Sequence, residues 1–350
     1  MSGRKILLKA PFRPTNNMID FQFLQNPISK EWVILAPRRA KRPDVAKGFE
    51  PACPFCPGRE GDEKEVYRIQ RLASSESASS SEANCTLDAN KLDANWLVRV
   101  IPNKFPFAPI HEVIIHSPEH SKNFDLLSLE QVELILKTYR QRFLSHQDKG
   151  NVYIFHNHSK GGGESLPHPH TQLAVIPFDV KIDIPRLDPS ASAEVAPEPV
   201  VLNDKAQLVK EEEFKEQETV ETENFYLFCP KTSQWPDETW IAPKKRGRLF
   251  SEITDEEITD LAFTLQRLIK IFDLRHGSEF PFNFYIYPGG DWYLRLIPRL
   301  KSLGGFEIGT KIFINTQDPE ETIAFIKEHF HNPDEEKIKN QHQAEYGRHV

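Results

Sequence analysis

Two stretches of the chain have the hydrophobic spacing of a long amphipathic helix. Each begins with a hydroxyl residue followed three positions later by Gln or Glu, as in Ser128 with Gln131 and Thr254 with Glu257. This pairing is a capping box, which marks a helix N-terminus. Apolar residues then recur at helical intervals, at Val132, Leu134, Ile135 and Tyr139 in the first stretch and at Ile258, Leu261, Leu265, Leu268 and Ile269 in the second.

Each predicted helix is followed by two apolar strands, the second of which ends in Ile-Pro. These strands are Asn151–Phe155 and His170–Pro177 in the first half, and Asn283–Tyr287 and Trp292–Pro298 in the second. A further apolar segment precedes each helix, at residues 111–115 and 237–241. The repeated order indicates a duplicated unit of about 100 residues or more. Few of the segments between the predicted elements are short enough for the compact βαβ crossovers that join parallel strands. We therefore expect an α+β fold with a largely antiparallel sheet.

The composition is that of a globular protein, and it argues against nucleic acids and membranes as partners. Of its 350 residues 39% are hydrophobic and 27% are charged, and the net charge is −7. Nucleic-acid binders usually carry a basic excess, so we expect no nucleic-acid partner. No apolar run reaches the roughly 18 residues of a membrane span, and no signal peptide is evident. The four cysteines form no disulfide framework, which favours a reducing compartment, the cytoplasm.

Segments of biased composition suggest domain boundaries. Residues 74–82 are a low-complexity run that predicts a loop, and residues 187–199 mix Pro, Ser, Ala and Glu as a linker does. We therefore expect an N-terminal domain at residues 1–186, the linker, a C-terminal domain at 200–333 and a polar tail at 334–350.

The strongest chemical signal is the sequence from Pro167 to Gln172, which contains His168 and His170. Alternate residues of a strand point to one face, so the two histidines and Gln172 can line one site. Imidazole attacks phosphorus well and leaves well, which suits group transfer. The alternative is a pair of surface histidines at a strand edge, the usual meaning of an isolated His-x-His.

The duplication assigns the chemistry to the first half. When the two strands that end in Ile-Pro are aligned, His168, His170 and Gln172 correspond to Asp291, Tyr293 and Arg295. The first copy retains groups suited to nucleophilic and metal chemistry, whereas the second does not.

A glycine-rich segment, residues 160–165 (KGGGES), precedes the histidine motif. Its glycines, including Gly162 and Gly163, would let the backbone approach a phosphate and turn amide groups toward it. Ser165 could add a hydroxyl donor. A flexible loop is the alternative meaning of a glycine triplet.

Cys53 and Cys56 have the spacing of half a zinc site. Histidines such as His120 and His168 could complete it, and a metal on His168 would fix the strand two residues from His170. A redox pair would favour a thioredoxin-like context, which is absent, and two plain buried cysteines remain possible.

A cluster of cations lies at Arg38, Arg39, Lys41 and Arg42. Arginine suits bidentate phosphate contacts, and a solvated loop is the alternative.

Taken together, these motifs resemble the galactose-1-phosphate uridylyltransferase family of the histidine-triad superfamily. The resemblance covers most of the chain, in motifs that occur in the family's order. They are residues 26–32 (NPISKEW), 36–43 (APRRAKRP), 53–56 (CPFC), 99–103 (RVIPN), 117–121 (SPEHS), 155–172 and 301–307 (KSLGGFE).

The resemblance implies two tandem histidine-triad-like domains, each a largely antiparallel sheet with packed helices, and a homodimer with shared active sites. It also implies a cytoplasmic enzyme of galactose metabolism with a ping-pong mechanism. In it, His170 takes UMP from a UDP-hexose and passes it to a hexose 1-phosphate, so the partners are nucleotide sugars and sugar 1-phosphates.

Site residues carry over position by position. His170, Gln172 and Ser165 are assigned to catalysis, and Zn²⁺ to Cys53, Cys56, His120 and His168. Substrate-binding roles go to Arg39, Arg42, Asn103, Asn157, Gly162, Gly163, Lys301, Phe306 and Glu307.

The chain also departs from the family pattern. Asp291-Trp-Tyr293 stands where members have a His-Trp-His pattern, so we expect the second family metal to be absent. Phe306 stands where a tyrosine is common, which leaves the hexose undetermined.

Three alternatives remain. An ADP-glucose phosphorylase-like adenylyltransferase fits residues 304–309 (GGFEIG) at least as well, so the base is undecided. A hydrolase of the superfamily would usually have a histidine in place of Gln172. A catalytically degenerate nucleotide-binding protein would not require intact His170 and Ser165.

Overall fold

The computed structural model describes residues 21–41, 53–70, 95–187, 218–277 and 280–346. The run at 74–82, the linker beyond residue 187, Arg42 and Cys85 therefore lie outside the described residues. Among the described helices, none combines the length and hydropathy needed to cross a membrane.

Ten strands form one antiparallel sheet in the order β3-β4-β5-β7-β6-β11-β12-β10-β9-β8. In the first half they are β3 (Tyr67–Gln70), β4 (Trp96–Pro102), β5 (Ile110–Ile115), β6 (Asn151–His158) and β7 (His170–Ile176). In the second half they are β8 (Val220–Glu221), β9 (Phe225–Phe228), β10 (Thr239–Pro243), β11 (Phe282–Ile286) and β12 (Leu294–Pro298). Antiparallel pairing and the strand positions confirm the α+β prediction.

The two halves share the same strand arrangement. The order β4-β5-β7-β6 on one side corresponds to β9-β10-β12-β11 on the other, and β6 pairs with β11 where the halves meet. The sequence led us to expect a sheet in each of two domains, but the structure joins the strands of both halves in one sheet.

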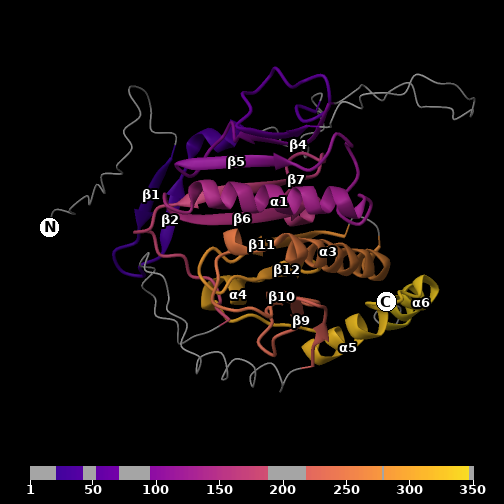
Figure 1. The fold of residues 1–350 in the computed structure, drawn as a ribbon. Coiled ribbons are helices and arrows are strands. Elements are labelled where there is room, and N and C mark those ends of the chain that lie inside the picture. Colours follow the sequence, from indigo (N-terminus) through magenta and orange to yellow (C-terminus); the bar gives the residue numbers. More distant parts are fainter. Residues whose placement is uncertain (1–20, 42–52, 71–94, 188–217, 278–279, 347–350) are drawn as a thin grey trace, which may run out of the picture.

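The long helices, α1 (Leu129–His146) and α3 (Asp255–His276), lie side by side over one face of this sheet (Figure 1). Thr254 and Glu257 form the predicted capping box of α3. Ser128 caps α1 by accepting from the Gln131 amide. The Gln131 side chain does not complete the box as expected, because it donates to the carbonyl oxygens of Leu97 and His116 at 2.8 and 2.7 Å.

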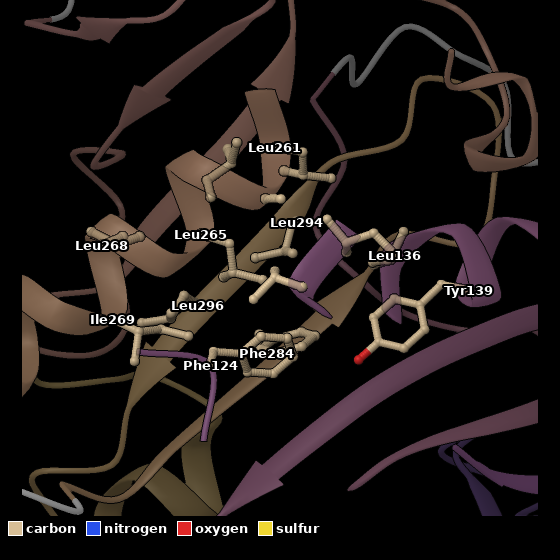
Figure 2. Close-up of a cluster of buried hydrophobic side chains, with 14 of the residues drawn as sticks. Phe124, Leu136, Tyr139, Leu261, Leu265, Leu268, Ile269, Phe284, Leu294 and Leu296 are labelled. Carbon is tan, nitrogen blue, oxygen red and sulfur yellow. The ribbon is translucent and has the colours of Figure 1, made fainter. Parts of the chain in front are cut away.

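The main core lies between these helices and the sheet. Figure 2 shows α3 side chains such as Leu265 packed against strand residues such as Phe284 and Leu296. Burial of this apolar surface is the main stabilising contribution to the fold. We call the sheet face that carries the helices the helix face, and the other the open face.

Shorter elements complete the molecule. A hairpin of β1 (Gln22–Gln25) and β2 (Trp32–Leu35) leads into a 3-10 turn, η1 (Pro37–Lys41). Two other 3-10 turns are η3 (Lys160–Gly162) and η4 (Phe250–Glu252). The C-terminal helices are α4 (Gly305–Thr310), α5 (Pro319–His329) and α6 (Glu335–Tyr346). The segment expected as a polar tail thus contains α6, which packs on α3 with Ile338 fully buried.

Candidate active site

His170 and Gln172 lie on the open face of β7, each about 5% exposed. Side chains alternate along a strand, so Thr171 and Leu173 point to the helix face instead. Leu173 belongs to the main core, whereas Ala174 packs with residues of the open face. The strand pattern predicted from sequence therefore brings His170 and Gln172 to one surface.

A hydrogen bond to the backbone orients the His170 ring. Its Nδ1 lies 2.8 Å from the carbonyl oxygen of His168. A carbonyl oxygen only accepts hydrogen bonds, so Nδ1 carries the proton and Nε2 carries the lone pair. A neutral imidazole held this way presents a nucleophilic nitrogen.

Phe55 packs against this ring, a contact that sequence analysis missed. The ring centroids of Phe55 and His170 are 5.2 Å apart in an edge arrangement, and Phe55 is 6% exposed. Phe55 is carried by the Cys53–Cys56 segment, which covers the open face beside Val113 and Ile115. Its position between two candidate metal ligands was the available signal.

Cys53, Cys56, His120 and His168 converge as predicted, and their ligand atoms all lie within 4.8 Å of one another. His168 Nδ1 is 3.7 Å from both sulfurs, and His120 Nδ1 is 3.2 Å from Cys56 Sγ. A tetrahedral ion with metal–sulfur bonds of about 2.3 Å and metal–nitrogen bonds of about 2.0 Å separates such ligands by about 3.6 Å. The four residues therefore fit a metal ion.

The second nitrogen of His168 is also placed for metal binding. Its Nε2 lies 2.8 Å from the carbonyl oxygen of Ser117, so Nε2 donates and Nδ1 keeps its lone pair toward the thiols. Burial lowers the pKa of His168 to about 4, which keeps the ring neutral. Burial and the neighbouring Cys53 raise the pKa of the Cys56 thiol to about 11, a preference for the protonated form that a bound cation would reverse.

Gln172 is held by two neighbours. Its Oε1 accepts from His111 Nε2 at 3.0 Å and from Asn103 Nδ2 at 3.3 Å. This orientation directs the Gln172 amide NH₂ away from its holders, where it can donate to a ligand. Asn103 was predicted as a site residue, but His111 was not, because its contact depends on the pairing of β5 with β7.

Arg39 reaches the same neighbourhood. Its Nη1 donates to the Phe105 carbonyl oxygen at 2.7 Å, and its guanidinium lies 4.8 Å from the centre of the Phe107 ring. Phe107 in turn packs on His111, with ring centroids 4.2 Å apart. Arg39, one of the two predicted phosphate-binding arginines, is therefore close to His111, which donates to Gln172.

The glycine-rich segment forms a tight turn that contacts β11. The amides of Gly162, Gly163 and Glu164 donate to carbonyl oxygens of Ser159 or Lys160, within the turn itself. A Cβ on Gly162 would come within 2.7 Å of the Phe282 carbonyl oxygen, and Gly163 has φ +84°. The glycines thus permit a tight turn against β11, and these three amides donate within that turn.

Ser165 lines a cavity of about 540 Å³ beside the glycine-rich segment, a volume typical of small-molecule pockets. The cavity extends to Pro169, the residue before His170, and is also lined by Lys160 and Asp125. Burial and the nearby carboxylate of Asp273 raise the pKa of Asp125. Asn157 lies on β6 opposite Asn283, next to the glycine-rich segment.

The second half has an ion pair where the first has Gln172. Arg295 pairs with Trp240 on β10 as Gln172 pairs with Val113 on β5. Arg295 donates to both carboxylate oxygens of Glu238 at 2.8 Å. A bidentate arginine–carboxylate pair fills this buried position with fixed charges.

The positions that we associated with a second metal have protein partners. The Asp291 carboxylate accepts from Arg246 Nε at 2.6 Å and from the Gly247 amide at 2.9 Å. The Tyr293 hydroxyl donates to the Pro185 carbonyl oxygen.

Lys301, Phe306 and Glu307 lie in the second half. The Lys301 ammonium is 3.5 Å from a Glu307 oxygen and 5.7 Å from the centre of the Trp235 ring. In the sheet, β6 and β11 lie between β7, which carries His170, and β12, the strand that precedes Lys301. Within one chain the fold places these three residues away from His170.

Comparison with known proteins identifies related chains. Residues 11–175 match the family model described as galactose-1-phosphate uridyl transferase, N-terminal domain, a range that includes His168, His170 and Gln172. The ADP-glucose phosphorylase of Arabidopsis thaliana is 25% identical, over 87% of this chain and 92% of that protein. The galactose-1-phosphate uridylyltransferase of Thermotoga maritima is 28% identical, over 87% of this chain and 96% of that protein.

A solved structure shares the fold. The crystal structure of an ADP-glucose phosphorylase from Arabidopsis thaliana with bound ADP-glucose matches with a TM-score of 0.60 and 24% identity. The match covers 88% of this chain and 99% of that one.

Proposed function

The chain belongs to the galactose-1-phosphate uridylyltransferase family, and on this premise we propose that it transfers a nucleoside monophosphate through a covalent intermediate on His170. One observation carries the proposal. The Nδ1 proton of His170 is committed to the His168 carbonyl oxygen, which leaves Nε2 as the nucleophile. Nucleotidyltransfer then needs no proton removal from the attacking atom.

The reaction is a double displacement. The Nε2 lone pair attacks the α-phosphorus of a nucleotide sugar, the phosphorus–oxygen bond to the sugar phosphate breaks, and a sugar 1-phosphate leaves. A phosphate oxygen of the acceptor then attacks the same phosphorus, and the phosphorus–nitrogen bond breaks to restore His170. The Gln172 amide, oriented by His111 and Asn103, donates to a phosphate oxygen as charge develops.

We propose UDP-hexose as the donor and a hexose 1-phosphate as the acceptor. Arg39 and Ser165 would contact the phosphates, and Asn103 and Asn157 the nucleotide. ADP-glucose is the second candidate donor, with phosphate as the acceptor. It is supported by the match with a plant ADP-glucose phosphorylase, as UDP-hexose is by the match with the Thermotoga maritima uridylyltransferase.

Zinc fits the Cys53, Cys56, His120 and His168 group best. Two sulfurs and two imidazole nitrogens are a common donor set for tetrahedral zinc. With all four positions occupied by protein, the ion would be structural, and it would hold His168 in place beside His170.

We also propose that the halves are tandem domains derived from one unit, with the boundary in residues 187–199. The matching strand orders on either side of the β6–β11 junction support this division. The first half would be catalytic and the second a degenerate copy, because Arg295 occupies the position of Gln172 and Glu238 that of His111.

A homodimer would complete each site. Lys301, Phe306 and Glu307 follow β12, which two strands separate from β7 and His170, so we propose that they serve the partner's site. The segment around them exposes large apolar side chains, a feature of interfaces. These are Phe306, Ile308, Ile312 and Ile314, which are 52 to 61% exposed.

Intact-mass spectrometry tests the mechanism and the base together. The purified protein would be incubated with UDP-glucose or ADP-glucose without an acceptor. A UMP or AMP adduct mapped to the His170 peptide would support the proposal and name the nucleotide. Absence of an adduct from both donors, with intact fold and metal content, would contradict the covalent mechanism with these donors.

A further inference from the structure

A cluster of polar side chains lies behind the nucleophile, on the helix face of the sheet. It consists of Thr171 on β7, Tyr139 on α1, His156 on β6 and His116, which directly follows β5. All four have 0% exposure. Figure 2 shows Tyr139 of α1 at the edge of the apolar core that contains Phe284 and Leu136. We call these residues the Thr171 cluster.

Thr171 is the centre of the cluster. Its Oγ1 lies 2.5 Å from the Tyr139 hydroxyl, 2.8 Å from His116 Nε2 and 3.2 Å from His156 Nδ1. The Tyr139 hydroxyl is also 3.2 Å from His116 Nε2. Since a hydroxyl has one proton and two lone pairs, these three contacts use the whole bonding capacity of Thr171.

His156 connects the cluster to the main chain of the nucleophile. Its Nδ1 lies 3.0 Å from the carbonyl oxygen of His170. A carbonyl only accepts, so His156 Nδ1 must donate. Burial lowers the pKa of His156 and of His116 well below the usual range, which keeps both rings neutral.

The cluster is costly as a purely structural feature. Among the described residues, His116 Nδ1 and His156 Nε2 have no hydrogen-bond partner, although both atoms are buried. Each such group costs about 1–3 kcal/mol. The surrounding core is apolar, with Phe124 and Phe284 against His156. Apolar side chains at these positions would avoid that cost.

We propose that Thr171 and His156 are positioning residues, which act through the backbone of His170 to aim its Nε2 at the substrate phosphorus. The proposal rests on the proposed nucleotidyltransfer. The hydrogen bonds of the Thr171 side chain fix the residue that follows the nucleophile. The His156 Nδ1–H group fixes the carbonyl group of His170, in the peptide that joins His170 to Thr171. With the peptide held from behind and Nδ1 held by the His168 carbonyl, the ring has little freedom to turn.

The test measures the rate of nucleotidyl-enzyme formation in a single turnover, with the donor that labels the wild type. Thr171→Val keeps the side-chain shape and removes the hydroxyl. We expect its rate at saturating donor to fall about 10-fold or more, since small misplacements of a reacting group are expensive. The donor concentration at half-maximal rate should change little. Thr171→Ser, which restores the hydroxyl, should recover most of the rate.

Thr264→Val is the matched control. Thr264 lies on α3, is equally buried, and its Oγ1 has no hydrogen-bond partner in the described part of the chain. This variant should keep the wild-type rate. If Thr171→Val does not fold, Tyr139→Phe provides the decisive measurement, because it removes one hydroxyl contact of Thr171 and keeps the ring.

Equal rates in the wild type, Thr171→Val and Tyr139→Phe would overturn the proposal. A fall in rate that simply follows the loss of thermal stability, and that Thr171→Ser does not rescue, would also overturn it. If the wild type forms no nucleotidyl-enzyme at all, the proposed function fails instead, so the two failures are distinguishable.

Discussion

The side-chain amide of Asn283 donates to Asn157 Oδ1 at 2.8 Å across the junction of β11 and β6. The same nitrogen lies 2.7 Å from the Gly162 carbonyl oxygen, and Arg299 holds Asn283 Oδ1 at 2.9 Å. One residue of the second half therefore fixes both a predicted nucleotide contact and the glycine-rich segment. The second half supports the site even though it carries none of the proposed chemistry.

Replacement of Asn283 should therefore weaken substrate binding. In Asn283→Ala, Asn157 and Gly162 lose their shared donor, and we expect KM for the nucleotide sugar to rise about 3- to 10-fold, the effect of one or two hydrogen bonds. Steady-state kinetics measure this. Asn224→Ala, which removes a bond to Asp260 away from the site, is the control and should leave KM unchanged.

His170→Gly should abolish nucleotide transfer and leave the fold largely intact. The ring donates to the adjacent backbone and packs edge-on against Phe55 at the open face of the sheet, outside the main core between the sheet and the helices. Adduct formation and circular dichroism would be compared with those of the wild type. Near-wild-type turnover in this variant would show that another group carries the nucleotide.

Cys53→Ser should lower both metal content and stability. A structural metal contributes its binding energy to folding, so we expect a loss on the order of several kcal/mol in the free energy of unfolding. Zinc content by elemental analysis and urea denaturation test this. Cys229→Ser is the control, because Cys229 is buried next to Thr239 and outside the metal group. Equal zinc in the wild type and both variants would remove the metal assignment.

A buried carboxylate predicts how stability depends on pH. Burial alone would raise the pKa of Glu112, but hydrogen bonds from His146 and Arg142 more than offset this and lower it. A depressed pKa means that stabilisation by Glu112 is complete above its unfolded pKa of roughly 4.3 and is lost as pH falls through the lower folded value.

Glu112→Gln should therefore destabilise the protein at neutral pH, by about 3 kcal/mol, because it leaves Arg142, whose side chain is only 11% exposed, without its carboxylate partner. The difference from wild type should shrink as pH falls below about 4. Denaturant unfolding at several pH values measures it. Glu119→Gln, at a half-exposed ion pair with Lys122, should change stability little. A pH-independent difference for Glu112→Gln would contradict the linkage.

Ile312→Asp should weaken the proposed homodimer. Ile312 is 61% exposed just after α4, in the apolar segment that would meet the partner. A charge buried at an apolar interface is unfavourable, so the variant should shift toward monomer in light scattering. Leu144→Asp, at a 50% exposed position on α1, is the control. A wild-type protein that is monomeric at all concentrations would contradict the interface.

The sequence by itself determined the features that depend on near neighbours. The starts of α1 and α3 follow from Ser128 and Thr254, because helix caps act over three residues. The shared face of His170 and Gln172 follows from the strand period of two. The four metal ligands carried over because the resemblance preserves their positions in the family's motifs.

Only the tertiary structure decided which strands and side chains meet across large separations in sequence. The pairing of β6 with β11 joins the halves in one sheet, and the β5–β7 register brings His111 to Gln172. The close approach of Gly162 to β11 and the Thr171 cluster behind His170 likewise depend on packing among distant segments. Helix and strand propensity and hydrophobic periodicity depend on residues close in sequence, whereas strand register and side-chain packing depend on the whole core. For this reason no local sequence pattern predicted these contacts.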